Sequence, residues 1–261
     1  MISSDVDWPV ELNNFVRSLG FEPAPVSTQI LPPDSITHLL MAIGSMSQSL
    51  INLSQDLWVY NMLGYIRIRG KPIGSSTMPH KVNPVDLENA EGNLKLGSSI
   101  LMEIGRYIQV SRLQRDLSDS TIKRNIGLGI GHVILGIRRL VHVLSGLEVN
   151  GDAMGRDLIN HWEVLSEAVQ VRLRALGVAD AYEKALSIFR GSRMSAEDYE
   201  KSLKELGIKD GRLLSLSPDK YIGYAREITM NSIKYCNDTM EFARSRVQEE
   251  LDRLKALGFL G

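Results

Sequence analysis

The apolar positions from residue 34 onward recur with a helical period. In the first stretch they alternate in steps of three and four: Ile36, Leu39, Ile43, Met46, Leu50, Leu53, Leu57 and Tyr60. This 3.5-residue period places them on one narrow seam of a long helix. Asp34 follows two prolines and is expected to be the N-cap of that helix.

Two further stretches predict long helices. Residues 84–109 carry apolar side chains on one side, with Pro84 near the first turn, where proline is favoured. A second seam steps by four and three through Ile122, Ile126, Ile130, Val133, Ile137, Leu140 and Leu144. Three helices with coiled-coil-like seams predict an all-α bundle.

Glycines inside the second seam indicate close helix packing. Gly127, Gly129, Gly131 and Gly136 lie within it, and each costs about 1 kcal/mol relative to alanine in a helix interior. A helix with that penalty needs neighbours on more than one side. We infer a homo-oligomer in which other copies complete the bundle. A monomeric helical domain that tolerates its glycines is the alternative.

The pattern changes near residue 150. Gly146 and the turn-like Asn150-Gly151-Asp152 end the long-helix region. Shorter amphipathic stretches follow at 153–175, 179–190 and 195–206, and a last long helix runs from after Ser217-Pro218 to about 256. We therefore expect part of a central helical bundle in 1–150 and a small helical domain in 151–261. Residues 65–69 alternate briefly, but no stretch predicts a strand convincingly.

Composition narrows the class of protein. The 261 residues include 30 Lys plus Arg and 31 Asp plus Glu, a net charge of −1, which provides no general attraction to nucleic acid or an anionic membrane. The single cysteine, Cys236, cannot form an internal disulfide, and no Cys/His spacing fits zinc. No apolar run approaches 18 residues. We expect a soluble cytoplasmic protein without a metal.

Residues 70–84 form a long connection between two predicted helices. Such loops are commonly functional. This one concentrates hydroxyls at Ser75, Ser76 and Thr77, a cation at Lys81 and an amide at Asn83. A surface connection without function is the alternative that composition leaves open.

The sequence GSSTMPHKVNP at 74–84 resembles the signature loop of the fumarase/aspartase superfamily of lyases. These enzymes release fumarate by β-elimination and are built on long-helix bundles with a small helical C-terminal domain. His80 before Lys81 leaves adenylosuccinate lyases and, as the second choice, carboxymuconate cycloisomerases. The segment QRDLSDSTIKRN at 114–125 resembles the phosphate-binding segment of adenylosuccinate lyases. Residues 27–30 and 160–167 agree with the bacterial form.

The resemblance implies roles for individual residues. Ser75 would be the general base, Lys81 would stabilise its alkoxide and the doubly charged intermediate, and Glu88 would orient the catalytic histidine. The substrate-binding positions would be Gln29, Ser76, Asn83, Asn89, Arg115, Ser120 and Arg124. Guanidinium groups suit a substrate phosphate, which they bind through paired hydrogen bonds. No metal and no organic cofactor are implied.

The superfamily's general-acid histidine has no counterpart here. It lies in a Thr-His-Gly-Gln motif, and none of the five histidines of this chain has such neighbours. The resemblance therefore covers the C-terminal portion of the enzyme, and we expect the chain alone to be inactive. The natural partners would be a phosphorylated purine-pathway substrate, further copies in a tetramer and a separate N-terminal half. A non-catalytic helical assembly fragment is the third hypothesis.

Active sites in the family combine segments of three subunits, so Ser75 and Arg115 can serve different sites.

Several other residues are expected to have structural roles. His132 and His142 should be satisfied core or interface side chains, and Cys236 a half-buried apolar one. Trp58 and Trp162 should be packing residues.

Overall fold

The computed structural model describes residues 5–69, 83–191 and 193–259. They form two compact units. One spans Ala24–Met154, and the other combines Met1–Pro23 with Gly155–Gly261.

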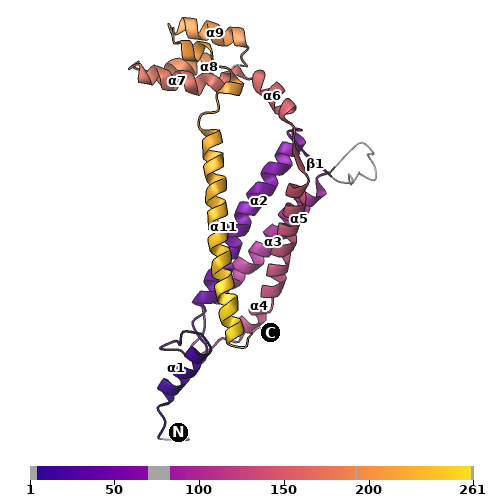
Figure 1. The fold of residues 1–261 in the computed structure, drawn as a ribbon, viewed down its shortest axis with the longest axis vertical. Helices are drawn as coiled ribbons and strands as arrows, with labels where there is room; N and C mark the ends of the chain where they lie inside the picture. Colours follow the sequence, from indigo (N-terminus) through magenta and orange to yellow (C-terminus); the bar gives the residue numbers. More distant parts are fainter. Residues whose placement is uncertain (1–4, 70–82, 192, 260–261) are drawn as a thin grey trace. The chain divides into compact units, whose positions relative to one another are not determined.

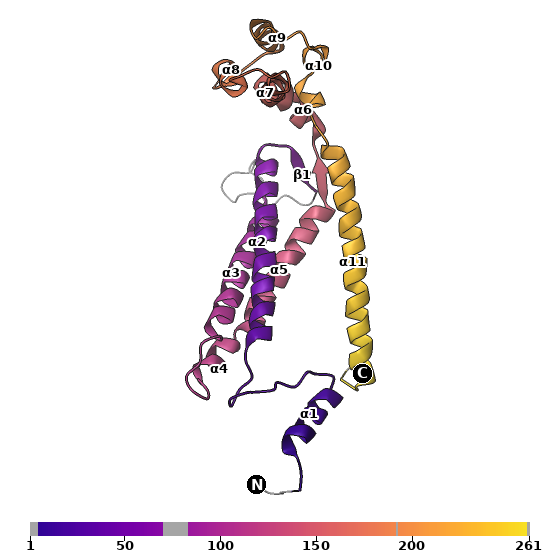
Figure 2. The ribbon, with the colours of Figure 1, turned by 90° about the vertical axis from the view of Figure 1, so that its left-hand side faces the viewer.

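The first unit is a bundle of three long helices. α2 (Asp34–Met62), α3 (Val85–Tyr107) and α5 (Ile126–Ser145) run side by side, and α3 packs on both of its neighbours (Figures 1 and 2). A short helix, α4 (Ser118–Lys123), precedes α5. The core consists mainly of side chains from the predicted helices: Leu40, Ile51, Leu57, Leu87, Leu94, Leu101, Ile104, Val133, Leu140 and Val143. The prediction of an all-α long-helix bundle is confirmed.

Two local predictions in this unit were wrong. Asp34 is the first residue of α2 rather than its N-cap, which is Pro33 without a side-chain cap. Residues 66–68 form a strand, β1 (Ile66–Ile68), which pairs antiparallel with β2 (Leu147–Val149). Three residues are too few for a sequence pattern to identify. The strand exists because a partner about 80 residues later supplies its hydrogen bonds.

The contact between α3 and α5 depends on glycines, which have no side chain. A Cβ at Gly97 would lie 2.8 Å from the carbonyl oxygen of Gly129, and a Cβ at Gly136 would lie 2.6 Å from Cγ of Leu94. These glycines are therefore required for the helices to approach. A Cβ at Gly127 or Gly131 would meet no atom within 4 Å. The expectation of close packing is thus confirmed for part of the seam, and the rest faces open space in the single chain.

The segment Ser118–Ser145 is, by length and composition alone, apolar enough to cross a membrane. One face of it packs along α3 through Gly129 and Gly136. The opposite face exposes Leu128, Leu135 and Val141. The apolar residues of this segment therefore lie partly on the face that packs on α3 and partly on a face that is exposed in the single chain.

The second unit is also helical. α1 (Trp8–Ser18) begins it, and after the bundle the chain continues with α6 (Gly151–Ile159), which crosses the boundary between the units. The following elements are η1 (Trp162–Leu165), α7 (Ser166–Ala175), α8 (Ala181–Phe189), α9 (Ala196–Glu205), α10 (Gly211–Leu214), η2 (Pro218–Lys220) and α11 (Ala225–Ala256). A separate core surrounds the buried side chains of Tyr199, Leu203 and Val169.

The structure corrects two expectations here. The predicted helix 153–175 is divided at residues 160–161 into α6, η1 and α7. For α1 no prediction was made; Asp7 caps this helix by accepting a hydrogen bond from Val10 N at 3.3 Å. Cys236 is exposed rather than half-buried, because α11 contains no buried residue.

We expect Gly97→Ala to destabilise the chain by about 1–3 kcal/mol, because the new methyl group would meet backbone atoms of α5. Gly92→Ala is the matched control. It lies on the exposed side of the same helix, where a Cβ meets nothing within 4 Å, and it should stabilise by up to about 1 kcal/mol. Urea unfolding followed by circular dichroism measures both. Equal effects of the two changes would contradict this account of the α3–α5 contact.

Candidate functional site

Seven of the ten predicted site residues lie within the described structure, and six of them form two groups. Asn83, Glu88 and Asn89 lie at the start of α3. Arg115, Ser120 and Arg124 follow the other end of this helix, around α4. Ser75, Ser76 and Lys81 lie outside the described residues.

The length of α3 separates these two groups. Tyr107 lies eighteen positions after Asn89, which corresponds to about 27 Å of helix. Tyr107 Oη donates to Ser118 Oγ at 2.9 Å and ties α4 to the end of α3. Figure 1 shows β1 and α4 at opposite ends of the bundle. One copy of the chain therefore does not bring the two groups together.

Gln29 belongs to neither group by direct contact. It is exposed in the segment that leads into α2. The first turn of α2 lies against the last turn of α3, where Thr37 Oγ1 donates to Gly105 O at 3.2 Å. The segment of Gln29 thus enters the bundle at the end of α3 that is followed by α4.

At the start of α3, Glu88 has a partner that the sequence analysis missed. Trp58 Nε1 donates to Glu88 Oε1 at 3.2 Å. The Trp58 ring also packs, half-buried, against the bundle core, so its predicted packing role is confirmed and is accompanied by a polar one. No local sequence signal links these residues, because they lie on different helices.

Further charged side chains surround Glu88. Asp86 pairs with Arg139 at 3.1 Å, and Glu91 pairs with Lys95 at 2.5 Å. The hydrogen bond from Lys95, more than any other contact, holds the pKa of Glu91 below its usual value. Glu88 itself has no cationic partner among the described residues. Its carboxylate therefore remains open to a cation, such as a protonated histidine.

Around α4, the acidic residues have hydrogen-bond partners, whereas two arginines form no ion pair among the described residues. Asp119 pairs with Lys123 at 2.7 Å, and this hydrogen bond is the largest cause of a lowered pKa of Asp119. Asp116 accepts hydrogen bonds from Ser118, which lower its pKa. Within the part of the chain that the structure describes, Arg115 and Arg124 form no ion pair and are exposed. Their guanidinium groups are exposed to an incoming anion, although the charge of Arg115 also contributes to the lowered pKa of Asp119.

Ser120 lies between these arginines in the sequence, on α4. Its Oγ donates to Leu117 O at 2.8 Å. A serine hydroxyl that donates to the backbone keeps its lone pairs available, and it can also reorient towards a ligand. The α4 segment thus offers two cations and one hydroxyl within ten residues.

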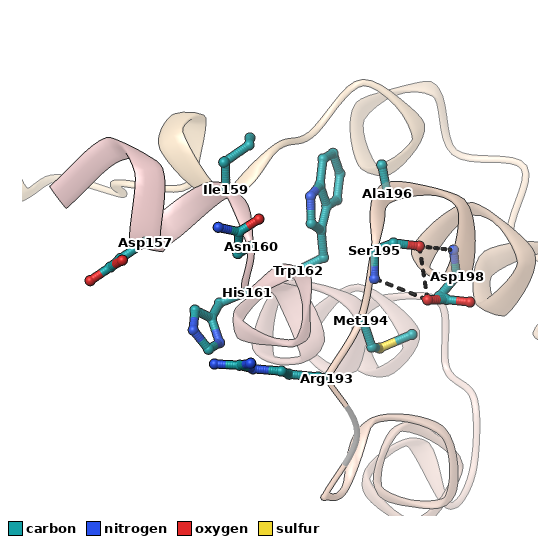
Figure 3. Close-up of a pocket in the computed structure, with 10 residues that line it drawn as sticks. All are labelled: Asp157, Ile159, Asn160, His161, Trp162, Arg193, Met194, Ser195, Ala196 and Asp198. Carbon is teal, nitrogen blue, oxygen red and sulfur yellow. Dashed lines mark hydrogen bonds between the residues drawn. The ribbon is translucent and has the colours of Figure 1, made fainter. Parts of the chain in front are cut away.

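The second unit contains a pocket that the sequence analysis did not predict. It measures about 670 Å³ and is shown in Figure 3. Its lining consists of Asp157, Ile159, Asn160, His161, Trp162, Arg193, Met194, Ser195, Ala196 and Asp198. Trp162 packs against Tyr199 with ring centroids 5.6 Å apart, which confirms its predicted packing role.

Glu163 links two lining residues of this pocket, His161 and Met194. Its carboxylate lies 2.6 Å from Nδ1 of His161 and accepts from Met194 N at 3.1 Å. Burial opposes ionisation of Glu163, but these hydrogen bonds outweigh it and lower the pKa of the carboxyl group. Ser195 and Asp198 form a capping box at the start of α9, so their polar atoms are satisfied locally. No group of three or more metal-ligating side chains occurs among the described residues.

Two family models match this chain in separate ranges of the sequence. The family described as "Adenylosuccinate lyase C-terminal" matches residues 111–222, and the family described as "Lyase" matches residues 9–97. The adenylosuccinate lyase of Vibrio cholerae is 40% identical over 230 residues, which cover 86% of this chain and 50% of the relative. The chain thus spans about half the length of the curated relatives it matches.

Solved structures show the same fold at low sequence identity. The 3-carboxy-cis,cis-muconate lactonizing enzyme of Pseudomonas putida has a TM-score of 0.60 and 23% identity, and it covers 78% of this chain and 48% of its own. A class II fumarase of Schistosoma mansoni has a TM-score of 0.59 and 19% identity, with 78% and 43% covered. At such identities the likeness supports the fold alone.

We expect Glu163→Gln to destabilise the chain by about 1–2 kcal/mol at pH 7, because it removes the charge that His161 and Met194 N contact. A lowered pKa stabilises the folded state above the usual value of 4.5, and this gain is lost as the pH falls through the folded pKa. The difference from the unaltered chain should therefore shrink as the pH falls below about 5.

Thermal unfolding at several pH values measures this difference. Glu183→Gln is the control, because Glu183 lies on α8 and shows no such contact among the described residues. A difference that is the same at all pH values would contradict the assigned role of the Glu163 charge.

Proposed function

The chain belongs to the adenylosuccinate lyase family of the fumarase/aspartase superfamily, and we propose that it supplies part of an active site for β-elimination of fumarate. The substrates would be adenylosuccinate, which gives AMP, and the succinyl-carboxamide imidazole ribotide of purine biosynthesis. The observation that carries this proposal is the 40% identity with an adenylosuccinate lyase over most of the chain.

The reaction needs a base, a stabilising cation and an acid, and the predicted residues would supply all of these except the acid. A base removes the proton from the carbon next to a carboxylate, which places a second negative charge on that group. The carbon–nitrogen bond then breaks, its electron pair leaves with nitrogen, and an acid protonates that nitrogen. We assign Ser75 as the base and Lys81 as the cation that stabilises both its alkoxide and the intermediate. Asn83 would donate to a succinyl carboxylate.

The phosphate would bind at the α4 segment. Arg115 and Arg124 are exposed and without ion pairs among the described residues, and Ser120 lies between them. Planar guanidinium groups bind phosphate oxygens in pairs. Gln29 and Ser76 would contribute further substrate contacts.

Separation of the two residue groups supports a site shared between copies. A nucleotide-sized substrate does not bridge about 27 Å of α3. The loop of one copy and the α4 segment of another would therefore have to meet at each site. The exposed apolar side chains Leu39, Met46 and Leu135 on the bundle helices offer surfaces for such contacts. We propose a homotetramer in the cytoplasm, without nucleic acid or membrane partners.

Two alternatives predict different outcomes. A carboxymuconate cycloisomerase would act on a substrate without phosphate, which leaves Arg115 and Arg124 without a role. A non-catalytic assembly fragment would gain no activity when an N-terminal half with the Thr-His-Gly-Gln motif is added. Assays with both substrates, with and without that half, distinguish the three hypotheses.

The purified chain alone should not convert adenylosuccinate measurably, because no histidine of this sequence has the surroundings of the general acid. Ultraviolet absorbance during incubation with adenylosuccinate measures turnover directly. Clear turnover by the chain alone would show that another group here supplies the proton.

Ser75→Ala should abolish turnover in the preparation reconstituted with an N-terminal half, since alanine cannot accept the substrate proton. Binding of adenylosuccinate should change little, because the hydroxyl contributes mainly to the transition state. Single-turnover absorbance and calorimetric titration measure the two quantities. Thr77→Ala, in the same loop, is the matched control and should retain turnover.

A further inference from the structure

A chain of polar side chains links α5 to the predicted site residue Asn89. Asn93 lies one turn after Asn89 on α3, and its Nδ2 is 2.9 Å from Asn89 O and 3.1 Å from Asn89 Oδ1. On the other side, Oδ1 of Asn93 lies 2.8 Å from Nδ1 of His132 on α5. Both Asn93 and His132 are half-buried, whereas Asn89 is exposed.

The backbone carbonyl of Asn89 determines the orientation of this chain. A carbonyl oxygen only accepts hydrogen bonds, so the Asn93 group that faces it must be the NH₂ group. The oxygen of Asn93 therefore faces His132. Because that oxygen also only accepts, the proton of the contact must reside on Nδ1 of His132. The backbone oxygen of Asn89 thus fixes the orientation of Asn93, and Asn93 in turn fixes the Nδ1-protonated tautomer of His132.

The same reasoning fixes the Asn89 amide. Its Oδ1 accepts from Asn93, so its NH₂ group is the part left for another partner. Asn89 follows Glu88 directly at the exposed start of α3. An amide held in this orientation offers hydrogen-bond donors, and it suits a negatively charged oxygen.

We propose that His132 and Asn93 are positioning residues, which hold Asn89 as a hydrogen-bond donor to a carboxylate or phosphate oxygen of the ligand. The inference rests on the proposed function for the identity of that ligand. It extends this function, because it assigns a ligand-directed role to a histidine that the sequence analysis expected to be only a satisfied core or interface residue. That expectation is met in part, since His132 does have a hydrogen-bond partner.

A purely structural role for the Asn93–His132 contact predicts a different result. In that case its loss would weaken the bundle and leave bound ligand unaffected. The bundle offers a matched control, because Gln48 Nε2 donates to Ser98 Oγ at 3.2 Å between α2 and α3. This contact also joins two helices but does not involve Asn89.

The first experiment is independent of any ligand. Nitrogen-15 NMR of the histidine-labelled chain should show the His132 proton on Nδ1. Asn93→Leu should remove this preference without unfolding the chain, which circular dichroism verifies. An unprotonated Nδ1 in the unaltered chain would overturn the inference.

The second experiment measures binding of fumarate and AMP separately, by calorimetric titration of the full 261-residue chain reconstituted with an N-terminal half. His132→Phe should weaken one of the two ligands roughly tenfold, the size expected for one charge-assisted hydrogen bond. The affected ligand identifies the partner of Asn89 as a carboxylate or a phosphate. His132→Asn should restore binding, because its amide nitrogen is attached at the same position as Nδ1.

Two further variants sharpen the result. Gln48→Leu should leave both affinities unchanged. With Asn89→Leu already present, His132→Phe should cause no additional loss, because the group that it positions is gone. Unchanged affinities in His132→Phe would overturn the inference. If the unaltered chain, reconstituted with an N-terminal half, bound neither ligand, the proposed function would fail, and the His132 spectrum would still accept or reject the assigned orientation.

Discussion

The close approach of α3 and α5 is the constraint on which the bundle depends. Gly97 faces the backbone carbonyl of Gly129 so closely that no side chain fits between them. This approach lets the helices bury Leu94, Leu101 and Val133 in one core. It also brings Asn93 and His132, each about one turn away from these glycines, within hydrogen-bond distance. The glycines therefore cost helix propensity but allow both apolar packing and a polar contact.

The rigidity of α3 organises the candidate site. A continuous helix of 23 residues keeps its two ends at a fixed separation, so Glu88 and Arg124 cannot meet within one copy. A site that needs both must be assembled between copies. The uncovered apolar faces of the bundle and the open glycine positions, Gly127 and Gly131, are consistent with that requirement. Under the proposed function, the geometry of one helix would link catalysis to association.

Sequence patterns predicted the long helices well because their period is a local property. Eight apolar positions in strict alternation identify α2 without any knowledge of its neighbours. Elements that depend on distant partners were missed. The strand β1 needs β2, and Cys236 is exposed on α11, a helix with no buried residue. Asp34 has the chemistry of an N-cap, but the helix begins one residue earlier than that role requires.

The sequence by itself determined the helical class, the long helices and the chemical identity of the loop and α4 motifs, because residue type and spacing carry that information. It did not determine which face of α2 packs, since Leu39 and Met46 of the predicted seam are exposed and Leu40 is buried. Only the tertiary structure decided which side chains meet. It placed Trp58 beside Glu88 and gave Asn93 the orientation that leaves the Asn89 NH₂ group free. It also separated the two groups of site residues by the length of α3. These relations arise from contacts between helices, which depend on how distant segments pack rather than on the pattern within any one of them.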